Sequence, residues 1–272
     1  MNPLRAPLDK QSLRGHVLGP RSPWRRLDVV PETGSTNADL VSRAMAGEDI
    51  DGAVLIAEHQ TMGRGRNGRE WSAIPGAQIL MSVGVTTHGV PADVWGWLPL
   101  ATGVAVADAV SATSGVDARL KWPNDVLAGG GKLAGILAEA VPTRDRIVVG
   151  IGLNVSLRSV EMPDVGIASL LELGVAAPDR NGLVQQLLLD LGGRIAEWRQ
   201  ISAGSTKLIV DYRARSATIG SRVSATLPGG GRVVGVARDV DDQGRLVIDA
   251  DGQPVAISAG DVVHLRPDGR SP

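Results

Sequence analysis

Glycine and arginine alternate in residues 60–71, Gln-Thr-Met-Gly-Arg-Gly-Arg-Asn-Gly-Arg-Glu-Trp, and this segment limits the possible structures most. Dense glycine raises the entropy lost on ordering, and neighbouring guanidinium groups repel one another, so we expect a mobile loop in the free protein. An anion would neutralise the arginines and accept hydrogen bonds from exposed backbone N–H groups. The segment therefore predicts a flexible clamp for phosphate or carboxylate. A solvated basic loop is the alternative, and it would suit one arginine better than three.

The spacing of these glycines, Gly-x-Gly-x-x-Gly, also matches the fingerprint of dinucleotide-binding folds. That fold needs a strand, a tight turn and then a helix, with an acidic ribose partner about 20 residues further on. Residues 69–76 instead contain a proline and a glycine and show no helical period, and residues 79–90 contain no Asp or Glu. The pattern therefore does not indicate a doubly wound dinucleotide-binding domain.

The composition predicts a large core without an unusual overall charge. The 272 residues are 43% hydrophobic and carry a net charge of −1, so no global field attracts nucleic acid. No apolar stretch approaches the ~20 residues of a membrane span, and the N-terminus has no apolar signal segment. We therefore expect a soluble, cytoplasmic protein with neither a nucleic-acid nor a membrane partner.

Cysteine is absent, which excludes disulfides, thiolate catalysis and cysteine-bound zinc. The histidines are far apart in sequence and do not have the spacing of metal ligands; they are His16, His59, His88 and His264. We expect no tightly bound metal cofactor.

The pattern of apolar residues changes near residue 215 and divides the chain into unequal parts. Residues 1–23 contain four of the sixteen prolines and are expected to form an arm over the main domain. Residues 24–215 alternate strand and helix patterns, which predicts an α/β domain. Residues 216–267 contain four or five short alternating runs between Gly- and Asp-rich turns, which is typical of a small barrel. Residues 268–272 are a tail.

Strands and helices of the main domain are expected from periodicity, caps and proline. The expected strands are 26–30, 53–58, 78–85, 132–140 and 146–155, the last being nearly all apolar and therefore central in the sheet. The expected helices are 36–46 with Ser35 as its cap, 99–112 with Pro99 in its first turn, 179–199 and 207–215.

Five short motifs follow one another in this domain. They are Gly-Ser-Thr-Asn (34–37), Gln-Thr-x-Gly-Arg-Gly-Arg-x-Gly-Arg-x-Trp (60–71), Lys-Trp-Pro-Asn-Asp (121–125), Lys-Leu-Ala-Gly-Ile-Leu-x-Glu (132–139) and Gly-x-Gly-x-Asn (150–154). Alone, the first is typical of a helix cap and the third of a turn. In this order they resemble the biotin–protein ligases. The resemblance implies an α/β (α+β) catalytic domain, with a mixed β-sheet flanked by helices, and a C-terminal SH3-like β-barrel.

The resemblance also implies a role for individual residues. The implied biotin site is Ser35, Thr36, Asn37, Gln60, Gly63, Arg64, Gly65, Arg66, Lys132 and Gly135. The implied nucleotide site is Arg64, Arg69, Trp71, Lys121, Asn124 and Asn154, with Asp125 as a ligand for Mg²⁺. Lys132 and Arg66 are the implied catalytic residues, with Lys132 between the biotin carboxylate and the α-phosphate, where its charge offsets the repulsion of two anions. Since all these residues precede residue 155, the C-terminal barrel is expected to contribute none.

The implied reaction joins biotin and ATP to biotinyl-5′-AMP and then transfers biotin to a lysine of a biotin carboxyl carrier domain of an acyl-CoA carboxylase. About 23 residues precede the catalytic domain, too few for a helix-turn-helix, so we expect a ligase without repressor activity. One alternative is a lipoate–protein ligase. Members of that family usually have an Arg-Arg-x-Ser-Gly-Gly-Gly loop, and residues 63–71 of this chain do not match it. Another is a non-enzymatic, ligand-responsive adaptor, which would leave the arginine loop unexplained.

Overall fold

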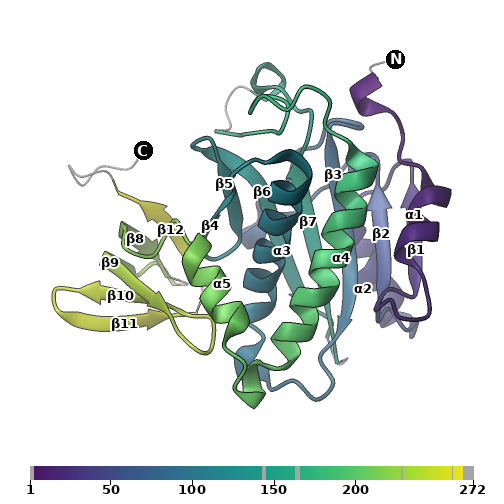
Figure 1. The fold of residues 1–272 in the computed structure, drawn as a ribbon. Coiled ribbons are helices and arrows are strands. Elements are labelled where there is room, and N and C mark those ends of the chain that lie inside the picture. The colour runs from purple at the N-terminus through teal and green to yellow at the C-terminus, as the bar shows by residue number, and fades with distance from the viewer. Residues whose placement is uncertain (1–2, 143–144, 163–165, 228, 259, 266–272) are drawn as a thin grey trace.

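Seven strands form a mixed sheet in the larger part of the protein (Figure 1). They are β1 (Arg26–Val30), β2 (Ala53–Ala57), β3 (Gln78–Thr86), β4 (Arg119–Lys121), β5 (Asp125–Ala128), β6 (Gly131–Ala140) and β7 (Arg146–Asn154). Their order is β1-β2-β3-β7-β6-β5-β4, so β7 is central as expected. β1 and β2 are parallel, and all other neighbours are antiparallel.

The computed structural model describes residues 3–142, 145–162, 166–227, 229–258 and 260–265, so the expected tail at 268–272 lies outside the described residues. The helices are α1 (Lys10–Val17), α2 (Thr36–Met45), α3 (Trp97–Ser114), α4 (Arg180–Arg199) and α5 (Lys207–Arg215). Single turns of 3₁₀ helix are η1 (Pro3–Arg5), η2 (Arg66–Gly68), η3 (Ala92–Val94), η4 (Ser159–Glu161) and η5 (Ile201–Ala203). Within the described ranges, none of the helices combines the length and the apolar character needed to span a membrane.

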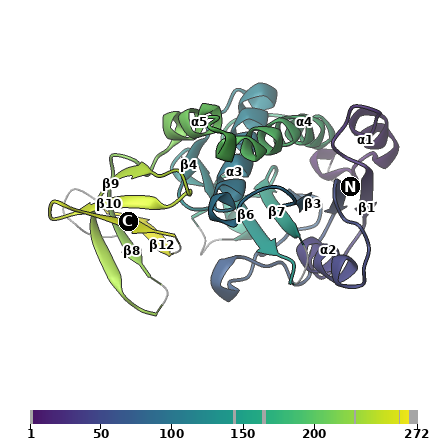
Figure 2. The same ribbon diagram turned by 90° about the horizontal axis from the view of Figure 1, so that it is seen from below.

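Helices lie on both faces of the large sheet (Figure 2). α3 and α4 pack against each other on one face, together with α1 and α5, whereas α2 lies on the other face against β2, β3 and β7. The face that carries α2 is the less covered one. The candidate site described below lies on it.

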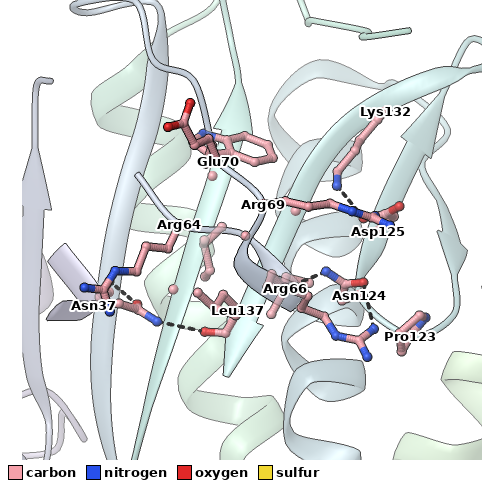
Figure 3. Close-up of a pocket in the computed structure, with 18 of the residues that line it drawn as sticks. Asn37, Arg64, Arg66, Arg69, Glu70, Pro123, Asn124, Asp125, Lys132 and Leu137 are labelled. Atoms are coloured by element: carbon pink, nitrogen blue, oxygen red, sulfur yellow. Dashed lines mark hydrogen bonds and ion pairs between the residues drawn. The ribbon is translucent and has the colours of Figure 1, made fainter. Parts of the chain in front are cut away.

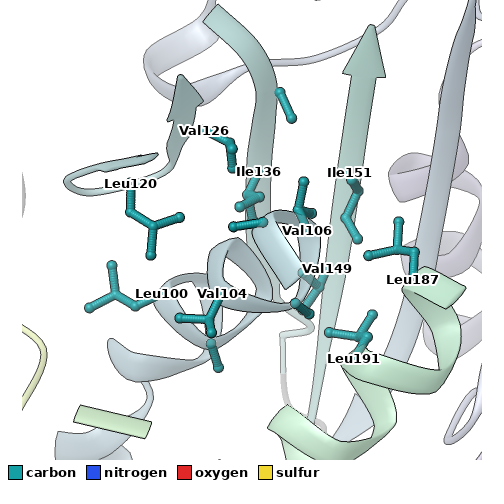
Figure 4. Close-up of a cluster of buried hydrophobic side chains, with 14 of the residues drawn as sticks. Leu100, Val104, Val106, Leu120, Val126, Ile136, Val149, Ile151, Leu187 and Leu191 are labelled. Carbon is teal, nitrogen blue, oxygen red and sulfur yellow. The ribbon is translucent and has the colours of Figure 1, made fainter. Parts of the chain in front are cut away.

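The main core lies between the sheet and helices α3 and α4 (Figure 4). α3 is apolar all round, and nearly all its side chains from Trp97 to Val110 are buried, as expected for a helix enclosed between two layers. The helix begins at Trp97, two residues before the predicted Pro99, because Gly96 already has helical backbone angles. Strand β5 is not among the expected strands, since the sequence there predicts a turn but gives no sign that the chain returns along β4.

A second sheet follows α5 in the chain. Its strands are β8 (Arg222–Thr226), β9 (Arg232–Val240), β10 (Leu246–Ala250), β11 (Gln253–Ile257) and β12 (Asp261–His264). They pair antiparallel in the order β11-β10-β9-β8-β12. The expected fold class, a mixed sheet with flanking helices and a small C-terminal β unit, is confirmed.

A tight turn of the second sheet is seated on the beginning of α3. The indole N–H of Trp97 donates to the backbone carbonyls of residues 241–242, and the indole N–H of Trp122 donates to the Gly244 carbonyl at 3.0 Å. Gly244 has a φ of +80°, and a Cβ atom there would lie 2.9 Å from the carbonyl carbon of Gly96. This close contact fixes the second sheet beside the Lys-Trp-Pro-Asn-Asp turn.

A buried ion pair ties the N-terminal residues to the base of the arginine loop. Arg180 is 4% exposed, and its guanidinium lies 2.7 Å from Glu58, immediately before that loop. The same guanidinium donates to the Ala6 carbonyl, and the backbone N–H of Leu8 donates to Glu58. The N-terminal segment therefore covers the side of the sheet near β1 and β2.

Candidate active site

A cavity on the α2 face brings together most of the residues that the sequence predicts for the site (Figure 3). The predicted residues that line it are Ser35, Thr36, Asn37, Gln60, Arg64, Gly65, Arg66, Arg69, Trp71, Lys121, Asn124, Asp125, Lys132 and Gly135. They come from the start of α2, the arginine loop, the β4–β5 turn and strand β6. Four segments that are far apart in sequence thus form one site.

Neutral hydrogen-bonding groups form the floor of the cavity at the start of α2. Ser35 caps the helix by accepting a hydrogen bond from the Ala38 N–H. Both the N–H and the hydroxyl of Thr36 donate to Gln60 Oε1, at 2.8 and 2.9 Å. An uncharged polar ligand suits this floor better than an ion, because the floor offers donors and acceptors without a net charge.

The arginine loop is a narrow ribbon that folds back on itself. The Trp71 N–H donates to the Gly63 carbonyl at 2.9 Å, and the Gly65 N–H donates to the Arg69 carbonyl at 2.7 Å. A Cβ atom at Gly63 would lie 2.3 Å from the Trp71 carbonyl oxygen, so only glycine allows this approach. Glycine here shapes the loop as well as loosening it.

The arginines of this loop reach different neighbours. Arg66 donates to Asn124 Oδ1 at 3.3 Å, and Arg69 forms an ion pair with Asp261 of β12. Burial lowers the pKa of the Arg66 guanidinium, although Asp261 and Asp125 act in the opposite direction. Arginine nevertheless stays charged in proteins. Arg66 is therefore a partly desolvated cation that an anionic ligand would stabilise.

Two lysines flank one carboxylate on the wall opposite the loop. Lys132 Nζ lies 2.6 Å from Asp125 Oδ1, and Lys121 Nζ lies 3.9 Å from Asp125 Oδ2. Among the described residues that line the cavity, five are cationic (Arg64, Arg66, Arg69, Lys121, Lys132) and three are acidic (Glu70, Asp125, Asp261). The excess of positive charge suits a polyanion such as a triphosphate.

The indole of Trp71 rests on two glycines of the sheet. Gly135 of β6 and Gly152 of β7 are paired neighbours, and Cβ atoms there would lie 2.7 and 2.4 Å from the Trp71 ring. Lys132 Nζ lies 5.4 Å from the ring centroid, within cation–π range. The buried indole N–H has no hydrogen-bond partner among the described residues.

Comparison with known proteins decides the family. Residues 33–156 match the model of the "Biotin/lipoate A/B protein ligase family", and residues 218–265 match that of the "Biotin protein ligase C terminal domain". The biotin–[acetyl-CoA-carboxylase] ligase of Mycobacterium tuberculosis is 58% identical over 97% of this chain and 98% of its own length. The chain belongs to the biotin protein ligase family. The bifunctional ligase/repressor BirA of Escherichia coli is a more distant relative, 34% identical over 82% of this chain and 69% of its own.

Solved biotin protein ligases share the fold. The Aquifex aeolicus enzyme in complex with biotin and ATP superposes with a TM-score of 0.75 and 24% identity, covering 88% of this chain and 98% of its own. The Leishmania major enzyme in complex with biotinyl-5-AMP gives a TM-score of 0.59 at 24% identity, covering 86% of this chain and 99% of its own. These similarities confirm the architecture of a biotin protein ligase.

Two predicted site residues lie away from the lining of the cavity. Gly63 lines an adjoining groove between the arginine loop and residues Leu137 and Glu139 of β6. Asn154 is 1% exposed, and its amide donates to the backbone carbonyls of Lys132 and Ala168 and accepts from Gln78. Its contact with adenine stays a prediction, and an adenine would have to replace one of these partners.

The second sheet contributes to the cavity, which corrects the expectation that it contributes nothing. Asp261, Val262 and Val263 of β12 line it, and Asp261 holds Arg69. Ser82, Gly150 and Glu70 are further lining residues that the sequence analysis does not assign. Glu70 and Gly150 lie in the motifs, but nothing in the local sequence around Ser82 or β12 indicates a site.

Proposed function

We propose that this protein activates biotin with ATP to give biotinyl-5′-AMP and then transfers biotin to a lysine of a biotin carboxyl carrier domain of an acyl-CoA carboxylase. The observation that carries the proposal is a cavity with a neutral hydrogen-bonding floor beside side chains that carry an excess of positive charge. A biotinyl adenylate has the matching halves, a neutral ureido ring and a phosphate. The relative from Mycobacterium tuberculosis, similar over its whole length, is a biotin–[acetyl-CoA-carboxylase] ligase and supports the same reaction.

Biotin enters with its ureido ring toward Ser35, Thr36 and Gln60, where it finds donors and acceptors in a largely buried site. Its carboxylate then points toward Lys132 on β6. The ATP phosphates lie among Arg66, Lys132 and the other cations of the cavity, and the adenine lies beside Trp71. This arrangement places the two reacting groups on either side of the Lys132 ammonium.

In the first step, a carboxylate oxygen of biotin attacks the α-phosphorus of ATP. A new oxygen–phosphorus bond forms while the bond to the β-phosphate oxygen breaks, and pyrophosphate leaves. Lys132 and Arg66 reduce the repulsion between the two anions and stabilise the charge that builds up on the α-phosphate. The protein gains rate by holding both reactants in line rather than by covalent catalysis.

Magnesium enters as part of the nucleotide substrate. No group of three His, Cys, Asp or Glu side chains that would hold a metal exists among the described residues. Asp125 fits as one ligand to an ion that is otherwise bound by phosphates and water, the usual mode for Mg²⁺. Lys132 already neutralises this carboxylate at 2.6 Å, so the ion depends on ATP for most of its binding energy.

In the second step, the uncharged amine of the carrier lysine attacks the carbonyl carbon of the mixed anhydride. The carbon–nitrogen amide bond forms, AMP leaves with the electrons of the carbon–oxygen bond, and the proton lost by the amine passes to solvent water. The arginine loop limits the access of water, which would otherwise hydrolyse the anhydride. Its ribbon-like shape over the cavity suits this role.

Incubation of the protein with biotin, ATP and Mg²⁺, followed by mass spectrometry, tests the proposal. We expect biotinyl-5′-AMP and, after addition of a biotin carboxyl carrier domain, a carrier heavier by one biotinyl group. A parallel incubation with lipoate and a lipoyl carrier domain is the control for the related activity. Formation of lipoyl-AMP without biotinyl-AMP would contradict the proposal, as would the absence of any adenylate.

A further inference from the structure

We infer that Glu139 is a positioning residue that sets the direction of the hydrogen bonds on the floor of the biotin pocket, acting through Asn37 and Ser82. The inference rests on the proposed function, because it concerns how this pocket distinguishes donors from acceptors in its ligand. Glu139 ends the Lys-Leu-Ala-Gly-Ile-Leu-x-Glu motif. None of the roles described above uses it.

The floor of the pocket has a gap in the sheet that Asn37 fills. Ser82 of β3 and Leu137 of β6 are both paired with Gly150 on the strand between them, β7. A Cβ atom at Gly150 would lie 2.3 Å from Asn37 Oδ1, so the missing side chain makes room for this amide. Asn37 is 3% exposed and lies over Gly150, with one end of its amide toward β3 and the other toward β6.

Glu139 is the nearer of two acceptors that hold this amide one way round, and it is the charged one. Asn37 Nδ2 lies 2.7 Å from Glu139 Oε2 and 3.2 Å from the Leu137 carbonyl oxygen (Figure 3 shows the contact with Leu137). A carboxylate and a carbonyl can only accept hydrogen bonds. The NH₂ group must therefore face β6, and Asn37 Oδ1 must face Ser82, whose hydroxyl donates to it at 2.6 Å.

This direction leaves the floor of the pocket rich in acceptors. Ser82 Oγ also lies 2.6 Å from Thr36 Oγ1, which lies 2.9 Å from Gln60 Oε1. Since Ser82 donates its hydroxyl hydrogen to Asn37, the Thr36 hydroxyl is the donor both to Ser82 Oγ and to Gln60 Oε1. Lone pairs on Ser82 and Thr36 are then left for a ligand, whereas Gln60 Oε1 already accepts from the N–H and the hydroxyl of Thr36. The ureido ring of biotin brings two N–H donors, and these match the lone pairs.

Loss of the Glu139 carboxylate would leave only the Leu137 carbonyl, the longer contact at 3.2 Å, to hold the Asn37 NH₂ group toward β6, so the opposite arrangement would compete with the native one. Asn37 would turn its amide and donate to Ser82, Ser82 would donate to Thr36, and Thr36 would donate to Gln60. The hydroxyl oxygens of Ser82 and Thr36 would then each receive a hydrogen from within the protein, as Gln60 Oε1 does in either arrangement. An N–H group of the ureido ring would be buried without a good acceptor, which weakens binding.

Two substitutions at Glu139 separate this role from a merely structural one. Glu139→Leu removes the acceptor, whereas Glu139→Gln keeps a side-chain oxygen that can accept from Asn37. We expect Glu139→Leu to raise both the calorimetric Kd for biotin and its KM in a pyrophosphate-release assay about tenfold, with the KM for ATP changed less than about twofold. Glu139→Gln is expected to stay within about threefold of the wild type for both substrates.

Gly150→Ala supplies a second test that leaves Glu139 in place, because the added methyl group displaces the Asn37 amide. It is expected to cause the same selective loss of biotin affinity. Gly193→Ala in α4 is the matched control, since a Cβ atom there meets nothing within 4 Å, and it is expected to bind biotin like the wild type.

The inference is overturned by an unchanged biotin Kd in both Glu139→Leu and Gly150→Ala, by an equal loss in Glu139→Gln, or by an equal rise in the KM for ATP. None of these three results would contradict the proposed function, because the wild-type protein would still bind and activate biotin. A wild-type protein that binds no biotin at all would instead overturn the proposed function and, with it, this inference.

Discussion

Replacement of Lys132 by alanine is expected to lower the rate of adenylate formation by two orders of magnitude while the fold is retained. In the structure this ammonium lies 2.6 Å from Asp125 and 5.4 Å from the Trp71 ring centroid. In the reaction it faces two anions, the biotin carboxylate and the α-phosphate. The variant therefore loses a stabilisation that grows as charge develops in the transition state.

The magnitude follows from the charge and the exposure of the side chain. Two unit charges about 4 Å apart attract by about 4 kcal/mol at an effective dielectric constant near 20, but by about 1 kcal/mol in bulk water. The Lys132 side chain is 33% exposed, so the contact falls between these limits and nearer to the first. A loss of about 3 kcal/mol corresponds to a decrease in rate on the order of 10².

The assay is biotin-dependent release of pyrophosphate at saturating ATP. Lys207→Ala removes a lysine that is 61% exposed on α5 and is the matched control, expected to react at the wild-type rate. Thermal unfolding of both variants reports whether the fold is retained. Release by Lys132→Ala at more than half the wild-type rate would refute the assignment and make Lys121 the next candidate.

Three further predictions concern the loop and the second sheet. Amides of residues 63–71 should exchange hydrogen quickly in the free protein and slowly with biotin and ATP, because the ligand phosphate neutralises the arginines; equal protection in both states would contradict the clamp. Gly244→Ala should unfold at a lower temperature than Gly230→Ala, since both glycines have positive φ but only Gly244 has backbone atoms within 4 Å of its Cβ position; equal unfolding temperatures would show that the close contact with α3 is unimportant. Deletion of residues 217–272 should slow both adenylate formation and carrier labelling, because it removes Asp261 from the cavity; labelling at the full rate would make the second sheet a passive appendage.

Elements with strong local signals are predictable from this sequence. Strand β1 and helix α5 have the expected bounds, and Ser35 caps α2 as expected. In each case a few adjacent residues determine the structure through periodicity or capping. β5 is missed because its four residues form a strand only through pairing with β4 and β6.

The site is predictable only where its residues lie in motifs. Lys132, Asp125 and Arg66 are found together as the resemblance implies. Asp261 and Ser82 are missed because their place in the cavity depends on how separate elements pack, and no local pattern reports it. Gly135 is assigned to the biotin site by the resemblance, but the sequence does not reveal that a tryptophan ring of the same chain lies against it.

The position of Trp71 also gives the protein an intrinsic optical reporter. The chain has six tryptophans, one tyrosine and no phenylalanine, so indoles dominate its emission. The other five indole N–H groups donate to backbone carbonyls in the described residues. Trp71 alone among them is carried by the arginine loop, between a cation and two glycines. A change in the emission of the unlabelled wild-type protein on addition of biotin and ATP would therefore report movement of the arginine loop, and stopped-flow fluorescence can time that change.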